Sequence, residues 1–300
     1  MSSHPLARLG WRAELQAHID AIGDSSLVAA RVTAVDRGSV IVDTGVSGWR
    51  APLAGRLRRA SAMPATGDFV AVLPDGGPVR AVLPRRGVIA RRVEGGRPQV
   101  LAANVDLALL ATSLNRDLNP RRIARFLAIT ARGEVEAVVL LTKADLVSDP
   151  GRFVAGFSDV GALAVSAVDG RGLDELRALL EPGRTAVLLG TSGVGKSTLL
   201  NVLLGEERQR TKPIRESDDR GRHATVRREL VSLPGGALLI DTPGLRSVAP
   251  LEDTDEEVPL LDKTQVKRER RAREREFHRG IYRELREKRR SRERRDRRAG

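Results

Sequence analysis

One eight-residue segment constrains this chain more than any other. Residues Gly190 to Ser197 match the pattern G-x-x-x-x-G-K-S, and they stand between the apolar run TAVLLG and the helix-like run KSTLLNVLLG. A strand that turns through glycines into a helix surrounds phosphate with backbone N–H groups and a positive helix end. This context therefore predicts a phosphate-binding loop in a parallel α/β domain. A glycine-rich turn without a ligand would not explain the strand together with the Lys-Ser pair.

Position within this loop predicts the role of each residue. We expect Lys196 to reach the β- and γ-phosphates and to act in catalysis, Ser197 to ligate Mg²⁺, and Thr198 to contact the α-phosphate. The other members are expected to contribute to phosphate binding: Gly190, Thr191, Ser192, Gly193, Val194 and Gly195.

A second motif, Asp241-Thr242-Pro243-Gly244, follows the apolar run ALLID. At a strand end facing phosphate, the Asp241 carboxylate can hold Mg²⁺ directly or through water, and the Gly244 N–H can sense the γ-phosphate. A D-x-x-G segment alone is a weak signal, but its position one strand after a phosphate loop makes it specific.

A third motif, Thr142-Lys143-Ala144-Asp145, closes the run VEAVVLL and resembles a guanine-recognition signal. Asp145 would accept hydrogen bonds from guanine N1–H and the 2-amino group. Adenine lacks that donor pair, so a buried Asp145 would be left unpaired against ATP. The Lys143 stem can lie over the base. Thr142 stands where Asn is usual, which affects the strength of purine contact more than the choice of guanine.

The T-K-x-D pattern also has a simpler interpretation, in which Asp145 merely caps a helix. The pair Ser166 and Ala167, which follows another predicted strand, favours nucleotide recognition because its backbone N–H groups can meet guanine O6.

These motifs stand in an unusual order, because the base signal precedes the phosphate loop. In an ordinary GTPase the phosphate loop comes first, and here the usual order is rotated around a circle, which keeps every neighbour in place. With a β-rich region before it and a basic tail after it, this order resembles the circularly permuted GTPases of the RsgA (YjeQ) family. The resemblance covers roughly residues 27–248.

The resemblance implies GTP hydrolysis coupled to late maturation of the small ribosomal subunit, with turnover stimulated by the subunit. The implied partners are that subunit and its ribosomal RNA, and the implied cofactor is Mg²⁺ with GTP. Members of the family normally carry a zinc-binding Cys/His module near the C-terminus. This chain has no cysteine and four histidines without metal-ligand spacing, so we expect no zinc.

The segment Gly221-Arg222-His223-Ala224-Thr225 resembles the family's G-R-H-T-T switch with the first threonine lost. Thr225 is our candidate for the switch threonine on Mg²⁺. Leu245 stands where Ras-like enzymes place a water-positioning glutamine. His223 could replace that residue by orienting or deprotonating the attacking water, or it could be an ordinary surface histidine near phosphates.

We expect a circularly permuted α/β P-loop GTPase domain, preceded by a small all-β OB-like barrel and followed by a basic helical tail. Helix signals include an N-cap at Asn119 with Pro120 in the first turn. The expected regions are an N-terminal extension (1–26), the barrel (27–97), the GTPase domain (98–249), an acidic linker (250–262) and a basic arm (263–300). Strands of the GTPase domain are expected near 105–111, 135–141, 162–165, 185–190, 227–233 and 237–241.

Most of the formal net charge of +13 lies in the arm, where residues 263–300 hold 18 lysines and arginines against 7 acidic residues. Such an arm gains affinity for RNA by releasing counterions from phosphates. The alternative is a solvated helix that keeps the protein in solution.

No apolar run reaches the ~18 residues that a membrane helix needs, and no apolar signal region opens the chain. We therefore expect a cytoplasmic protein, monomeric and without a membrane partner. Two other functions compete with the GTPase: an ATPase or kinase with the same phosphate chemistry, and an RNA-binding protein with a weak or vestigial nucleotide pocket.

Overall fold

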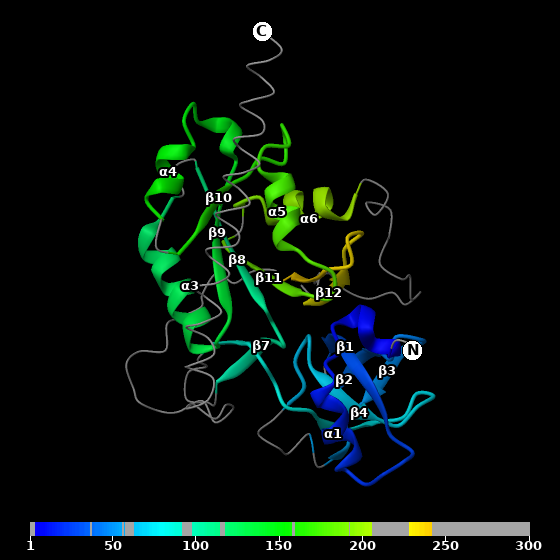
Figure 1. Cartoon of the computed structure of the whole chain (residues 1–300). Coiled ribbons are helices and arrows are strands. Elements are labelled where there is room, and N and C mark those ends of the chain that lie inside the picture. The colour runs from blue at the N-terminus through cyan, green and yellow to red at the C-terminus, as the bar shows by residue number, and fades with distance from the viewer. Residues whose placement is uncertain are drawn as a thin grey trace, which may run out of the picture. The chain divides into compact units, whose positions relative to one another are not determined.

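The computed structural model of the chain is drawn in Figure 1 and describes residues 4–36, 38–55, 57, 63–91, 98–114, 118–157, 160–191, 193–205 and 228–241. All of them lie within one compact unit, residues 1–256. Several predictions lie outside the described residues: those for Ser192, His223, Thr225, Gly244, the acidic linker and the basic arm.

Five antiparallel strands form the N-terminal β region. They are β1 (Val28–Asp36), β2 (Ser39–Asp43), β3 (Gly48–Pro52), β4 (Phe69–Val72) and β5 (Val79–Val82). The first strand pairs with both β2 and β4, while β3 pairs with β2 and β5 with β4. A parallel bridge from Leu53 to Val79 closes the ring. This order is that of a five-stranded OB-like barrel, which agrees with the small all-β module expected before the GTPase domain.

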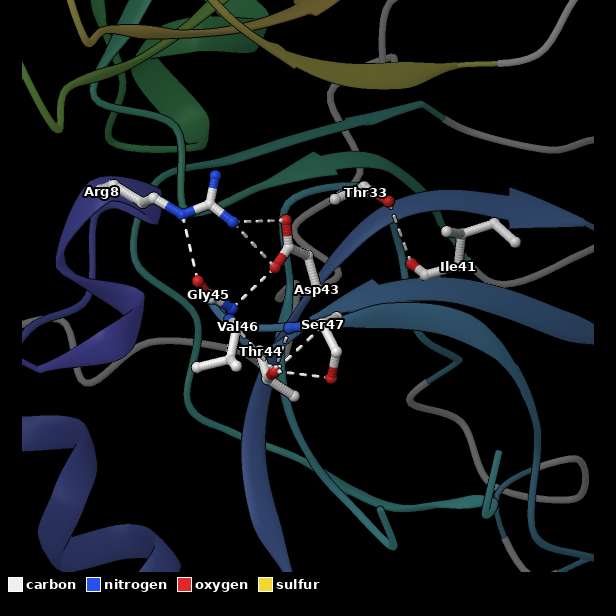
Figure 2. A network of polar contacts seen from close by, with 8 residues as sticks. All are labelled: Arg8, Thr33, Ile41, Asp43, Thr44, Gly45, Val46 and Ser47. Carbon is white, nitrogen blue, oxygen red and sulfur yellow. Dashed lines mark hydrogen bonds and ion pairs between the residues drawn. The ribbon is translucent and has the colours of Figure 1, made fainter. Parts of the chain in front are cut away.

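The β2–β3 turn is held by a polar network (Figure 2). Asp43 accepts from the Gly45 amide at 2.6 Å and from the Arg8 guanidinium at 3.3 Å. Gly45 has φ +86°, and a Cβ there would lie 2.0 Å from Pro5 O. Only glycine therefore permits this approach, which brings the N-terminal segment against the barrel.

The N-terminal extension contributes to two hydrophobic cores. It contains the 3₁₀ helix η1 (Pro5–Leu9) and the helix α1 (Glu14–Asp20). Leu6 and Leu9 are buried with residues of the GTPase sheet, whereas Leu15 and Ile19 are buried with Phe69 of the barrel. This packing role was not predicted from the sequence.

The second β region is the sheet of the α/β domain. Its strands are β8 (Leu107–Ser113), β9 (Glu136–Thr142), β10 (Ala162–Ala164), β11 (Thr185–Leu189), β12 (Glu229–Ser232) and β13 (Leu238–Asp241). They lie in the order β10-β9-β8-β11-β13-β12, parallel except for β12. All six were predicted within a few residues, because buried parallel strands read as continuous apolar runs.

Helices cover this sheet. They are α3 (Pro120–Arg132), α4 (Gly151–Ala155), α5 (Leu173–Leu179) and α6 (Lys196–Leu204), with the short 3₁₀ helix η2 (Ala144–Leu146). Figure 1 shows α3 and α4 on one side and α5 and α6 on the other. The predicted cap is confirmed, since the Asn119 side chain accepts from Arg122 N. Among the described helices, none combines the length and the apolarity needed to cross a bilayer.

The hairpin of β6 (Val88–Arg91) and β7 (Gln99–Ala103) was not predicted. Its residues Ile89 and Leu101 are buried in the same core as Phe126 of α3. The hairpin spans the expected boundary between residues 97 and 98, and the regional boundaries remain predictions.

Candidate nucleotide-binding site

The described parts of the predicted motifs meet at one edge of the sheet. In parallel strands the carboxyl ends lie along the same edge, where α/β proteins bind ligands. Thr142 ends β9 and Asp241 ends β13, while the phosphate loop (Gly190 to Ser197) follows β11 directly. Strand register aligns these ends, because Ser113 of β8 pairs with Thr142 and Leu188 of β11 pairs with Asp241.

The phosphate loop makes a tight turn from β11 into α6. A Cβ added at Gly190 would lie 2.6 Å from Ala111 O, so the loop can lie this close to β8 only with glycine there. Val194 is fully buried, whereas Ser197 and Thr198 in the first turn of α6 are exposed. The hydroxyls expected to meet Mg²⁺ and the α-phosphate are thus accessible at a helix N-terminus.

Lys196 is buried and folds back over its own loop. Its Nζ donates to Gly190 O at 2.8 Å and to Thr191 O at 2.6 Å. Burial lowers the pKa of Lys196, and the negative charge of Asp241 opposes that shift. The ammonium therefore sits in the loop and can exchange these carbonyls for phosphate oxygens.

Asp241 carries the complementary charge at the end of β13. Burial raises the pKa of its carboxyl group, Lys196 opposes the shift, and Glu229 adds to it. A partly desolvated carboxylate with a raised pKa favours a nearby cation.

The base loop (Thr142 to Asp145) is joined to the phosphate loop by two side chains. Thr142 Oγ1 donates to Val194 O at 2.6 Å. Lys143 has a left-handed backbone, φ +57°, and its Nζ donates to Gly193 O at 2.9 Å. Two loops far apart in the sequence are therefore in direct contact.

Asp145 departs from the expectation that it would be buried. It lies in η2, outside the sheet, and it is exposed. One carboxylate oxygen accepts from Ser166 Oγ at 2.7 Å. If Asp145 selects guanine over adenine, as the sequence predicts, the base itself would have to cover this carboxylate.

The two amides expected at guanine O6 differ in this structure. The Ser166 N–H already donates to Arg171 O at 2.9 Å, which closes the turn after β10. For Ala167 N–H, no hydrogen-bond partner is found among the described residues. The Ala167 amide is therefore the donor available for a ligand.

Arg122 was not identified from the sequence. It lies in the first turn of α3, and its Nη1 donates to Thr191 Oγ1 at 3.1 Å. Nothing local marks this residue among the four arginines of α3, because only the tertiary structure brings the helix start to the phosphate loop.

Comparison with known proteins gives a consistent assignment. The model of the RsgA GTPase family matches residues 82–250. The chain belongs to the RsgA GTPase family. A protein from Streptomyces avermitilis named small ribosomal subunit biogenesis GTPase RsgA is 45% identical over 267 residues, which cover 82% of this chain and 70% of that protein. Membership of this GTPase family identifies the chain as a GTP-hydrolysing enzyme.

Solved structures support the permuted fold of this RsgA-family chain. The crystal structure of YjeQ from Thermotoga maritima aligns with a TM-score of 0.56 and 26% identity, covering 73% of this chain and 75% of that one. The crystal structure of YloQ, a circularly permuted GTPase, aligns with a TM-score of 0.51 and 20% identity, covering 75% of this chain and 74% of that one. The rotated motif order is thus explained by a circular permutation.

Proposed function

We propose that the carboxyl edge of the β8–β13 sheet binds GTP with Mg²⁺ in a single pocket and hydrolyses it. The observation that carries this proposal is the pair of contacts from the base loop to the phosphate loop, Thr142 to Val194 and Lys143 to Gly193. They support the proposal because they join the loop that carries Asp145 to the loop that carries Lys196.

In this pocket Asp145 accepts from guanine N1–H and the 2-amino group, and the Ala167 amide donates to O6. The Lys143 stem lies over the base. Lys196 leaves Gly190 O and Thr191 O for the β- and γ-phosphates, while the loop amides and Thr198 contact the remaining phosphate oxygens.

The donor set at the phosphate end fits magnesium, which prefers hard oxygen ligands. Ser197 offers a hydroxyl and Asp241 a carboxylate whose raised pKa reflects desolvation that a cation would relieve. Thr225 completes the proposed set from outside the described residues. Mg²⁺ supplies neutralisation of charge on the β- and γ-phosphate oxygens. Among the described residues, no group of three or more His, Asp or Glu forms a metal site by itself.

The proposed water-positioning residue is His223, since Leu245 replaces the glutamine of Ras-like enzymes. A histidine on a switch segment is placed correctly only when that segment is ordered. We therefore expect slow unassisted turnover that a partner accelerates by positioning His223. The Gly244 amide would sense the γ-phosphate.

We propose that the partner is the small ribosomal subunit and that GTP hydrolysis accompanies its late maturation, in the cytoplasm and with the protein as a monomer. The relative from Streptomyces avermitilis bears that role in its name. The basic arm is proposed to contact ribosomal RNA in place of a zinc module, because it concentrates a charge of +11.

The direct test measures GTP turnover by the full chain with and without purified small subunits. We expect stimulation by the subunits and loss of turnover in Lys196→Ala, while Arg177→Ala on the exposed surface of α5 keeps wild-type turnover. Competition by GTP and ATP against a labelled GTP analogue should favour GTP by orders of magnitude. Absent turnover with intact RNA binding would instead support the vestigial pocket.

The arm is tested by the salt dependence of RNA binding, comparing the full chain with a chain that ends at Pro250. Without the arm, the shorter chain neutralises fewer RNA phosphates, so its log affinity should depend less steeply on log salt concentration. In the sequence, the segment after Gly244 continues through the acidic linker into the arm. We therefore expect the slope to differ between a non-hydrolysable GTP analogue and GDP in the full chain, but not in the chain that ends at Pro250. The same nucleotide dependence in both chains would contradict this coupling.

A further inference from the structure

Thr142 is hydrogen-bonded in a way that limits what it can offer to a ligand. Its Oγ1 lies 2.6 Å from Val194 O and 3.2 Å from Thr112 O. Both neighbours are carbonyl oxygens, which only accept. A threonine hydroxyl carries a single hydrogen, so these two carbonyls share the one donor that the side chain has.

Burial holds this arrangement in place. Thr142 is 4% exposed and Val194 is fully buried, so water does not replace either partner. Turning the hydroxyl towards a ligand would leave the buried Val194 carbonyl without its side-chain donor, which is unfavourable. The hydroxyl therefore serves to join the base loop to the phosphate loop.

Because the Thr142 hydroxyl is engaged, it cannot donate to the acceptor atoms on the edge of a bound guanine. With N1–H and the 2-amino group on Asp145, the next positions around the ring are O6 and N7, and both are acceptors. The Ala167 amide is available for O6. An asparagine in place of Thr142 would have two N–H hydrogens, one for Val194 O and one for N7. Threonine has none left for N7.

We infer that this chain recognises guanine without a hydrogen bond to N7, so that Thr142 makes the pocket tolerant of guanine nucleotides modified at that position. This inference rests on the proposed function, in which Asp145 and Lys196 hold one guanine nucleotide. It assigns Thr142 a positioning role between two loops and a permissive role in base selection.

The test uses the full chain and calorimetric dissociation constants for GDP, 7-deaza-GDP, in which N7 is replaced by C–H, and IDP, which lacks the 2-amino group. The wild type should bind GDP and 7-deaza-GDP within about twofold of each other, and IDP more weakly. In Thr142→Asn a new hydrogen bond should tighten GDP binding and introduce a five- to tenfold preference, roughly, for GDP over 7-deaza-GDP.

Thr142→Val is the matched control, because it keeps the β-branched shape and removes the hydroxyl. It should bind both nucleotides more weakly by the same factor, since only the links from the hydroxyl to Val194 O and Thr112 O are lost. Thermal melting establishes that each variant is folded, and if Thr142→Asn is not, the wild-type comparison decides alone.

The outcomes separate the two proposals. A wild type that binds none of the guanine nucleotides contradicts the proposed function. If the wild type binds GDP but binds 7-deaza-GDP fivefold or more weakly, the inference about N7 is overturned and the proposed function stands.

Discussion

Arg31 Nη2 donates to Thr185 Oγ1 at 2.9 Å, which joins the barrel strand β1 to the first residue of the strand that leads into the phosphate loop. The same guanidinium donates to the carbonyls of Gly67, Asn104 and Leu9 and lies 4.7 Å from the ring centre of Phe69. Burial lowers the pKa of Arg31 to about 10. A buried cation that is still charged at neutral pH therefore links the barrel to the GTPase sheet.

Replacing Arg31 with Met should lower the free energy of unfolding by about 3 kcal/mol, because it leaves several buried acceptors unpaired. Arg8→Met is the control, since Arg8 is an exposed arginine paired with Asp43 and should change stability by less than about 1 kcal/mol. Urea denaturation measures both. Equal effects of the two substitutions would show that the buried contacts are not what stabilises the fold.

The buried pair Arg85 and Asp68, with an N–O distance of 2.7 Å, predicts a pH-dependent defect. Burial raises the pKa of Asp68, and Arg85 opposes that shift. Arg85→Met removes the cation paired with a buried carboxylate and should destabilise the fold by about 3 kcal/mol at neutral pH. The defect should shrink as pH falls, because protonation removes the unpaired charge.

The double variant Asp68→Asn, Arg85→Met controls for lost packing. It should recover part of the stability at neutral pH and lose the pH dependence, as followed by thermal melting at several pH values. A double variant as unstable as Arg85→Met would contradict the charge explanation.

Asp241→Asn should stabilise the nucleotide-free protein while abolishing Mg²⁺-dependent GTP binding. The folded-state pKa of Asp241 is raised, so the wild type loses stability as pH rises through that pKa. The variant cannot ionise, and its melting temperature should exceed that of the wild type by about 1 to 3 °C at neutral pH. At pH values below the pKa of Asp241 in the unfolded chain the two should converge. A variant that melts lower than wild type at neutral pH would contradict this.

Arg122 should support nucleotide binding through Thr191. Arg122→Ala and Thr191→Val should each weaken GDP binding by about three- to fivefold. The double variant should bind little more weakly than either, because each substitution removes the same hydrogen bond between the two side chains. Arg125→Ala, at an exposed position on the same helix, is the control and should bind like wild type. Additive losses in a fluorescent GDP assay would show that the two residues act separately.

Much of the fold could be predicted because its signals are local. Buried parallel strands read as apolar runs, Asn119 and Pro120 mark a helix start, and glycines with Lys196 mark a phosphate loop. The rotated order of the motifs specified the permutation, since sheet neighbours are preserved by rotation. The roles of individual site residues remain predictions.

Other features could not be read from the chain because they depend on contacts between distant segments. Burial of Arg31 and the approach of Arg122 to Thr191 arise from packing, as does the exposure of Asp145. The amino-acid sequence by itself determined which chemical groups end each strand, since periodicity and glycine placement are local properties. Only the tertiary structure decided which acceptor receives the single hydrogen of Thr142, because a hydroxyl's partner is set by the backbone that folding brings beside it.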